Sequence, residues 1–170
     1  GSRILAADWS ISPGIEVTQE YNSNVLLTED ERIEDFITEV KPRIQILRET
    51  DSSRLDFSSM VIGQKYIDHD DLDTLNNETN LNFTHSWSSK FSNDLSLGFV
   101  KDNILESELD RAGLRAVRQD RYRYLLDLSN NYQLSETLFV KFGGGVYQNV
   151  YPDGPYPDLF QWLVRLNPGW

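Results

Sequence analysis

The chain has only two histidines, His69 and His85, which are its natural candidates for acid–base chemistry. A barrel enzyme that modifies lipids would need a histidine beside a serine and a carboxylate. His85 directly precedes Ser86, and adjacent side chains of a strand point to opposite faces of a sheet. These two residues therefore cannot form a nucleophile–base pair. The sequence predicts no catalytic role, and a lipid-modifying outer-membrane enzyme is the least favoured function.

The second candidate chemistry is cation binding by the acidic run around His69. Calcium takes about 6 to 8 oxygen ligands, and this run lacks the glycine and the bidentate glutamate of the known calcium loop. The absence of cysteine also excludes disulfides and thiolate metal sites. A solvated acidic loop is therefore favoured, with no metal and no cofactor. The weak candidate ligands are Asp68, Asp70, Asp71 and Asp73.

Three consecutive glycines, residues 143–145, do not form a phosphate-binding loop, because neither a helix nor a lysine follows them. They lie within an alternating segment, where glycine allows a strand to bend or to pack closely.

Composition narrows the class of protein. The 170 residues suit one domain, and the net charge of −11 argues against nucleic acid, whose phosphates need a basic surface. No apolar run approaches the roughly 18 residues of a membrane helix. The mean hydropathy of −0.49 does not exclude a membrane barrel, in which only alternate residues are apolar. Residues 1–8 resemble a cloning scar followed by the remnant of a secretory signal, and residues 9–170 form the predicted domain.

Apolar residues recur at every second position along most of this domain. Val140, Phe142 and Val146 share one face of a segment whose other face carries Lys141. A period of two indicates β-strands. Eight segments have this character: residues 9–21, 36–46, 55–67, 81–87, 95–102, 121–132, 138–147 and 160–167. Pro13 and Pro42 predict bulges or strand ends, because proline removes a donor from the ladder.

The connections between these segments alternate in length. Short, turn-like connections lie near residues 51–53, 88–94 and 135–136. Longer connections, mostly acidic, are expected at residues 22–35, 68–79, 104–120 and 152–158; the third could instead hold a short helix. Antiparallel hairpins with tight turns at one end and long loops at the other are typical of outer-membrane barrels. An even number of strands would place both termini at the short-turn, periplasmic end.

The same alternation fits two opposite proteins. A soluble, secreted or periplasmic β-sandwich or barrel that binds a ligand or partner would bury Trp87, Phe99 and Trp162 in a core. A membrane barrel would turn the apolar face to lipid and the polar face to its lumen. Charged residues in mid-strand favour the membrane barrel, as do aromatic residues near strand ends. Arg48, His85 and Lys101 on the apolar face count against it.

The predicted site residues follow from strand parity, so a register slip of one residue would invert them. The expected lumen lining, which would set selectivity in a wide barrel or form an ion-paired plug in a narrow one, is Glu39, Lys41, Arg43, Arg121, Arg123, Asp127, Lys141 and Arg165. The expected interfacial aromatics are Trp9, Tyr21, Phe36, Trp87, Tyr122, Tyr132 and Trp162.

The opening of the chain resembles a family of outer-membrane β-barrel porins associated with exopolysaccharide and exosortase loci. The resemblance rests on residues 21–25, which read Tyr-Asn-Ser-Asn-Val, and on residues 35–38, which read Asp-Phe-Ile-Thr before a second strand containing Pro42. It is good over the first 45 residues and loose beyond them. Family members are commonly about twice as long, so this chain would be a short member or part of a larger barrel.

The predicted fold is therefore all-β, an antiparallel up-and-down transmembrane β-barrel with about eight strands in this chain, or eight strands of a larger barrel. The resemblance implies a porin-like or exopolysaccharide-export-associated channel in the bacterial outer membrane. Its expected partners are outer-membrane lipid, lipopolysaccharide, and polysaccharide or small solutes. Because the interior of an eight-stranded barrel is filled by side chains, only a wider barrel would conduct.

Overall fold

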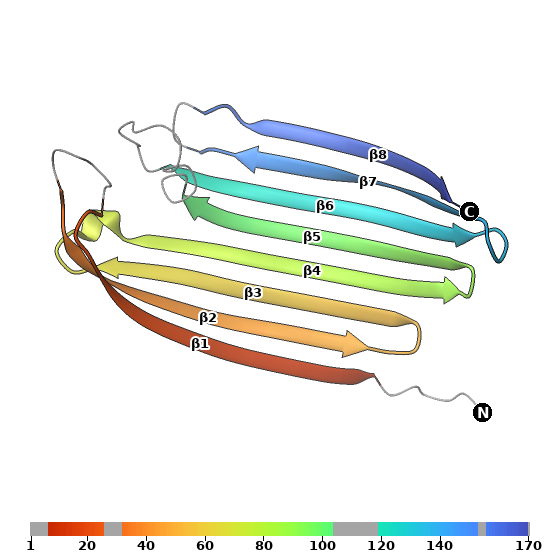
Figure 1. The fold of residues 1–170 in the computed structure, drawn as a ribbon, viewed down its shortest axis with the longest axis horizontal. Helices are drawn as coiled ribbons and strands as arrows, with labels where there is room; N and C mark the ends of the chain where they lie inside the picture. The colour runs from red at the N-terminus through yellow and green to blue at the C-terminus, as the bar shows by residue number, and fades with distance from the viewer. Residues whose placement is uncertain (1–6, 26–31, 104–118, 153–155, 170) are drawn as a thin grey trace.

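The computed structural model describes residues 7–25, 32–103, 119–152 and 156–169. They form one antiparallel sheet whose strands are hydrogen-bonded in chain order from β1 to β8 (Figure 1). The predicted all-β, up-and-down fold is confirmed. The strands are β1 (Asp8–Asn22), β2 (Asp35–Glu49), β3 (Ser53–Tyr66), β4 (Thr74–Ser88), β5 (Phe91–Asn103), β6 (Asp120–Gln133), β7 (Phe139–Val150) and β8 (Leu159–Gly169). A 3-10 helix, η1 (Asp70–Leu72), lies between β3 and β4.

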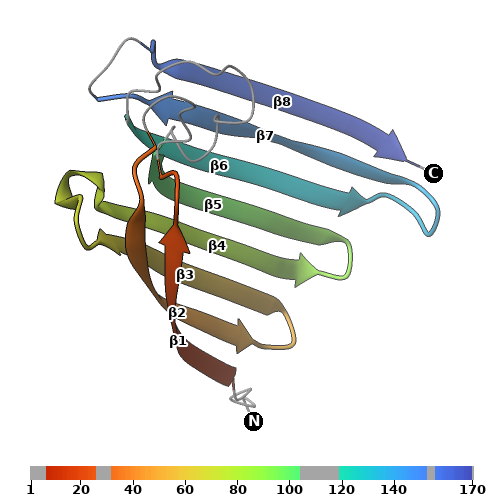
Figure 2. The same ribbon diagram turned by 60° about the vertical axis from the view of Figure 1, so that its left-hand side comes forward.

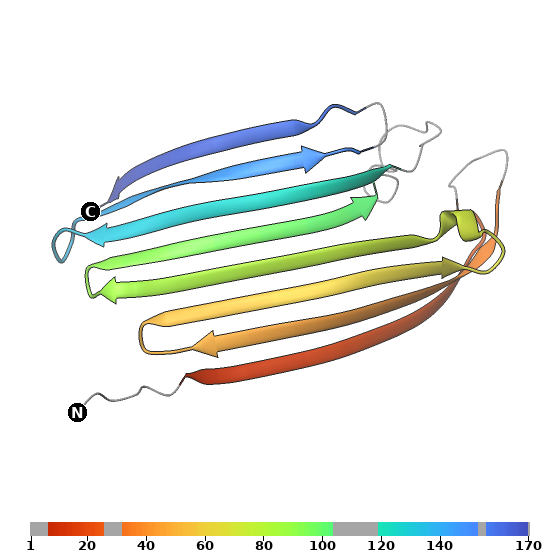
Figure 3. The same cartoon turned by 180° about the vertical axis from the view of Figure 1, so that it is seen from behind.

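The sheet is a single curved layer that does not close into a barrel. Among the described residues, no second layer covers either face of the sheet in any view (Figures 1, 2 and 3). β1 and β8 stand at opposite sides of the sheet, each hydrogen-bonded to one neighbour within the described part of the chain. In that part, no helix has the length and apolar character needed to cross a membrane.

Short and long connections occupy opposite ends of the sheet, as the sequence predicted. The turns β2–β3, β4–β5 and β6–β7 lie at one end, where β1 also begins and β8 ends (Figure 3). This end is called the turn end, and the opposite one the loop end. The prediction of a long loop at residues 68–79 is wrong, because β4 already begins at Thr74. The third long connection, residues 104–118, lies outside the described residues.

The early start of β4 has a local cause. The first residues of β4 are rich in asparagine, which usually indicates a loop. Here the polar side chains bond across the ladder: Asn77 Nδ2 donates to the carbonyl of Met60 (3.2 Å), and Thr74 Oγ1 donates to Gln64 Oε1 (2.8 Å). These bonds to β3 replace the loop-forming contacts that asparagine otherwise makes.

The two prolines do not end their strands, contrary to the prediction. Pro13 lies within β1, and the paired positions of β1 and β2 continue through it without a break. Pro42 lies within β2, and the paired positions of β2 and β3 are interrupted between Val40 and Arg43. The consequence of Pro42 is therefore a gap in the ladder instead of a bulge.

The strands are staggered in one direction across the sheet. One row of paired residues runs across the sheet from Pro13 on β1 to Phe160 on β8. Pro13 lies nine residues from the loop end of β1, whereas Phe160 lies one residue from the loop end of β8. The stagger is thus about one residue per strand. With about 3.3 Å per residue and about 4.8 Å between strands, it corresponds to a tilt of about 35°, as in barrels.

Candidate functional site

Apart from a bulge between Ser86 and Ser88 at the end of β4, the register brings alternate residues of the eight strands onto common faces, so the sheet has one apolar face and one polar face. One complete row of the apolar face runs from Pro13 to Phe160, and it contains the following paired residues: Pro13, Ile44, Ser59, Thr79, Phe99, Tyr124, Gln148 and Phe160. Large apolar side chains on this face are exposed, with Trp162 at 71% and Leu166 at 74%. Of the three residues expected in a soluble core, Trp162 and Trp87 are exposed within this chain, Trp87 at 68%, whereas Phe99 is partly buried.

Polar residues on the apolar face are confined to strand ends, with one exception. Arg48 lies next to the end of β2, with its guanidinium 5.7 Å from the Trp9 ring. Lys101 lies near the loop end of β5 and forms an ion pair with Asp120 (3.2 Å). The exception is a central pair of hydroxyls, Ser59 and Thr79, which bond to each other at 2.9 Å. The middle of this face therefore carries no charge.

The seven aromatic residues expected at membrane interfaces all lie on the apolar face. Each is within three residues of an end of its strand, and Tyr21 and Phe36 are in contact, with centroids 5.1 Å apart. His85 also lies on this face, between Phe83 and Trp87, with 4.5 Å between the His85 and Trp87 centroids. Ser86 points to the other face, so the structure does not bring these two residues together.

The eight residues expected to line a lumen share the polar face, and three separate groups form among them. In the first, Glu39 accepts hydrogen bonds from Gln64 Nε2 (3.2 Å) and Thr18 Oγ1 (3.4 Å) and is 2.5 Å from Lys41 Nζ. The carboxylate of Glu39 thus joins β1, β2 and β3. Neither Thr18 nor Gln64 was predicted from the sequence, because parity alone does not say which neighbours meet.

The second group lies toward the loop end of β5 and β6. Both Arg121 and Arg123 donate to Asp102, with Nη2 of each guanidinium 2.8 Å from Asp102 Oδ2. Asp102 was not predicted, although a carboxylate at the same end of the neighbouring strand is the signal that would have indicated it. Two guanidiniums share one carboxylate here, so the group has a net positive charge.

The third group pairs Arg165 of β8 with Asp127 of β6 across β7. Gly143 and Gly145 occupy the β7 positions between them. A Cβ on Gly145 would lie 2.7 Å from Asp127 Oδ2, so a larger residue there would displace the Asp127 carboxylate from its position in this pair. The predicted use of the glycine run for close packing is confirmed in this respect.

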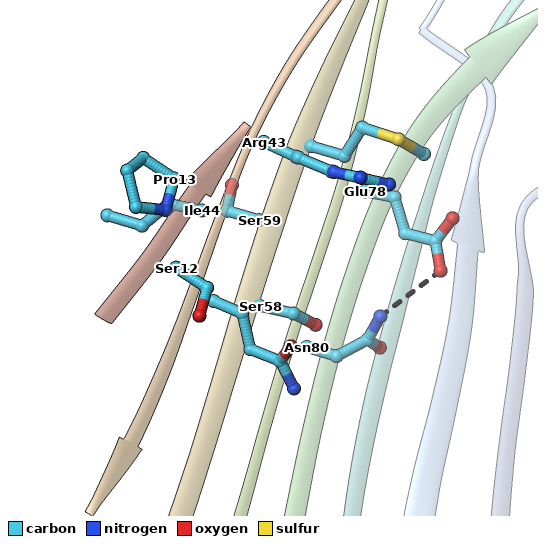
Figure 4. A pocket seen from close by; sticks show the side chains of 10 residues that line it. Ser12, Pro13, Arg43, Ile44, Ser58, Ser59, Glu78 and Asn80 are labelled. Carbon is cyan, nitrogen blue, oxygen red and sulfur yellow. Dashed lines mark hydrogen bonds between the residues drawn. The ribbon is translucent and has the colours of Figure 1, made fainter. Parts of the chain in front are cut away.

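Arg43 lies in an open hollow of about 470 Å³ on the polar face (Figure 4). Its side chain lies across Gly14, where a Cβ would be 2.8 Å from Arg43 Nε. Ser12, Ser58 and Asn80 line the same hollow, and Asn80 Nδ2 donates to Glu78 Oε1 at 3.1 Å. Within the described chain no carboxylate pairs with Arg43, so its guanidinium faces the hollow.

Charge is divided unequally over the polar face. On β1 to β4 the carboxylates outnumber the basic residues, and these charged residues are Asp8, Glu16, Glu20, Asp35, Glu39, Lys41, Arg43, Glu49, Arg54, Asp56 and Glu78. On β5 to β8 the basic residues outnumber the carboxylates by one, and these are Asp94, Asp102, Arg121, Arg123, Asp127, Lys141 and Arg165.

At the loop end, a buried carboxylate holds the β3–β4 connection. Asp35 is 2% exposed; it accepts hydrogen bonds from the backbone N–H of Ile67 (3.1 Å) and of His69 (3.0 Å), and it lies 2.9 Å from His69 Nδ1. Burial alone would raise the pKa of the Asp35 carboxyl, but the hydrogen bonds from His69 and the backbone outweigh it and lower this pKa. No sequence pattern indicated this contact.

The acidic run beside it does not gather around a common point. Asp73 accepts from the backbone N–H of Tyr66 (2.9 Å) and lies 2.5 Å from Lys65 Nζ. Among the described residues, no group of three or more histidine or carboxylate side chains is placed to hold a metal ion.

The fold and its two faces define a single-layer antiparallel β-meander with one apolar and one polar surface. Comparison with protein-family models, with curated proteins and with solved structures finds no match to this chain.

Proposed function

We propose that this chain forms part of the wall of an outer-membrane β-barrel, with its apolar face toward lipid and its polar face toward a lumen. One observation carries the proposal: the uncovered apolar face is free of charge in its middle, and its charged residues lie at strand ends. A soluble protein rarely exposes a large apolar surface to water. Lipid stabilises such a surface, and it tolerates charged side chains only near the interfaces.

The dimensions of the apolar face support this orientation. Trp9 and Tyr21 lie twelve residues apart on β1, a length of about 40 Å along a strand and about 30 Å once the strand is tilted by about 35–45°. Membrane barrels have an apolar band about 25 Å tall between two aromatic girdles. The paired hydroxyls of Ser59 and Thr79 need no water, so they fit the middle of such a band.

The proposed role is that of a porin-like or export-associated channel without catalytic function. The charged polar face supports a lumen, since its ion pairs and exposed guanidinium suit a water-filled interior. The resemblance of residues 21–45 to exopolysaccharide-associated porins supports polysaccharide or small solutes as cargo. At the loop end, the exposed carboxylates Asp68, Asp70 and Asp71 would meet lipopolysaccharide, whose phosphates share divalent cations with acidic loops.

Refolding tests this proposal directly. Denatured protein is diluted into plain buffer, into detergent micelles and into lipid vesicles, and folding is followed by circular dichroism and by heat-modifiable gel migration. We expect β-structure and heat-modifiable migration only with detergent or lipid. A monodisperse β-rich protein in plain buffer, with blue-shifted tryptophan emission, would overturn the proposal in favour of a soluble ligand-binding sandwich.

A further inference from the structure

The outer edges of β1 and β8 present two unpaired backbone ladders within the described residues. An exposed edge of this length is a template for pairing with another strand, and barrels remove such edges by closure. In a membrane an unpaired edge is especially unfavourable, because no water satisfies its N–H and C=O groups. Given the proposed membrane location, on which this inference rests, both edges need a partner.

We propose that the partner is a second copy of this chain, with β8 of each copy pairing with β1 of the other. β1 and β8 run in opposite directions, because the eight strands alternate. A neighbouring copy in the same orientation therefore continues the antiparallel meander without a break. Two such contacts, related by a two-fold axis along the barrel, close a ring of two copies.

The side chains of the two edges are complementary in charge. β1 carries Asp8, Glu16 and Glu20 and has no basic residue, whereas the one charged residue of β8 is Arg165. Pairing β8 with β1 places unlike charges side by side. Pairing β1 with a second β1 would instead bring carboxylates together, which is unfavourable in a sheet.

The two faces of the edge strands limit the register of this contact, because a shift of one residue would mix apolar and polar side chains. Aligning the middles of the two strands places Ile15 opposite Val164, which keeps apolar residues of both copies on the same face. Thr18 then lies opposite Gln161, Ser12 opposite Asn167, and Glu16 diagonal to Arg165. Diagonal neighbours in a sheet are within reach of long side chains such as glutamate and arginine.

The number of strands also favours two copies over closure of one. Eight strands leave an interior filled by side chains, whereas about 16 strands enclose an aqueous channel. The single chain is an open sheet with β1 and β8 at opposite sides (Figure 2). Two copies would place the acidic polar face of β1 to β4 of one copy beside the polar face of β5 to β8 of the other, where basic residues outnumber carboxylates by one.

Cysteine cross-linking tests the proposal cleanly, because the chain has no native cysteine. The variants Thr18→Cys and Gln161→Cys are mixed in denaturant, refolded together in detergent and oxidised. We expect a disulfide-linked dimer in the mixture, at least tenfold more abundant than with the mismatched mixture of Ser12→Cys and Gln161→Cys. Ser12→Cys mixed with Asn167→Cys should cross-link as well as the first pair.

Two further measurements make every outcome decisive. Light scattering of the unmodified protein in detergent should give the mass of two chains; the mass of one chain, or of three or more, overturns the proposal. A chain carrying both Thr18→Cys and Gln161→Cys should form only covalent dimers, and an internal disulfide in a monomer would mean that one copy closes on itself. A monomer that still inserts into vesicles would overturn the pairing alone, whereas a cross-linked dimer that folds in plain buffer would overturn the membrane location alone.

Discussion

Arg165 on β8 forms an ion pair with Asp127 on β6 across the whole width of the intervening strand β7. The pair is possible because β7 carries glycine at the two positions beneath it, Gly143 and Gly145. Close packing here extends to the backbone: a Cβ on Gly143 would collide with the carbonyl oxygen of Leu128. This contact thus joins three strands, and it requires that the two β7 positions between its partners carry no side chain.

Alanine at these glycines should destabilise the folded sheet. We expect Gly145→Ala to cost about 1–3 kcal/mol of unfolding free energy, because its Cβ overlaps Asp127, and Gly143→Ala to cost at least as much. Gly63→Ala is the matched control, since the nearest atoms to its Cβ would be 3.9 Å away. Urea unfolding of the refolded protein, followed by tryptophan fluorescence, gives these values. Equal stability of the three variants would contradict the packing argument.

The two faces can be compared at adjacent leucines of equal exposure. Leu125 lies on the polar face and Leu126 on the apolar face, and each is 45% exposed. Arginine near the middle of a lipid-facing band costs about 2–4 kcal/mol, whereas a lumen position tolerates it. Leu126→Arg should therefore reduce folding into vesicles strongly, and Leu125→Arg should leave it nearly unchanged. The fraction folded, measured by heat-modifiable migration, would be equal for both variants if water bathed both faces.

The predicted architecture came from a signal that is strong in this chain. A period of two survives along strands of 11 to 15 residues, so strand number, order and face could be read without coordinates. The start of β4 could not, because asparagine favours loops until it finds partners on the neighbouring strand. The partners Asp102 and Asp35 were missed for a related reason: contacts across strands depend on register, which parity alone does not determine.

Ion preference should respond to the group formed by Arg121, Arg123 and Asp102. Asp102→Asn removes the carboxylate that both guanidiniums share, so we expect a shift toward anions in the reversal potential across planar bilayers. Gln substitutions at Arg121 and Arg123 should shift it toward cations. Lys90→Gln, in the β4–β5 turn, is the control and should change little. Unchanged conductance and ion preference in the arginine variants would count against a lumen-lining role.

The contact between Asp35 and the β3–β4 connection should make the loop end sensitive to acid. Asp35 is the first residue of β2, beyond Phe36 and outside the apolar band, and its folded-state pKa is lower than usual. A depressed carboxyl pKa contributes stability that is present above the unfolded-state value of about 3.9 and is lost as the pH falls through the folded-state value.

Cleavage of the connection by pepsin should therefore increase steeply below about pH 4, when its rate is compared with that of an exposed peptide. Asp35→Asn should remove the acid-dependent step in the pepsin profile and should leave the connection accessible at neutral pH to a protease that is active there, such as thermolysin. Asp51→Asn, in the β2–β3 turn, should behave like the unmodified protein. A wild-type cleavage profile in Asp35→Asn would mean that the buried carboxylate does not hold this connection.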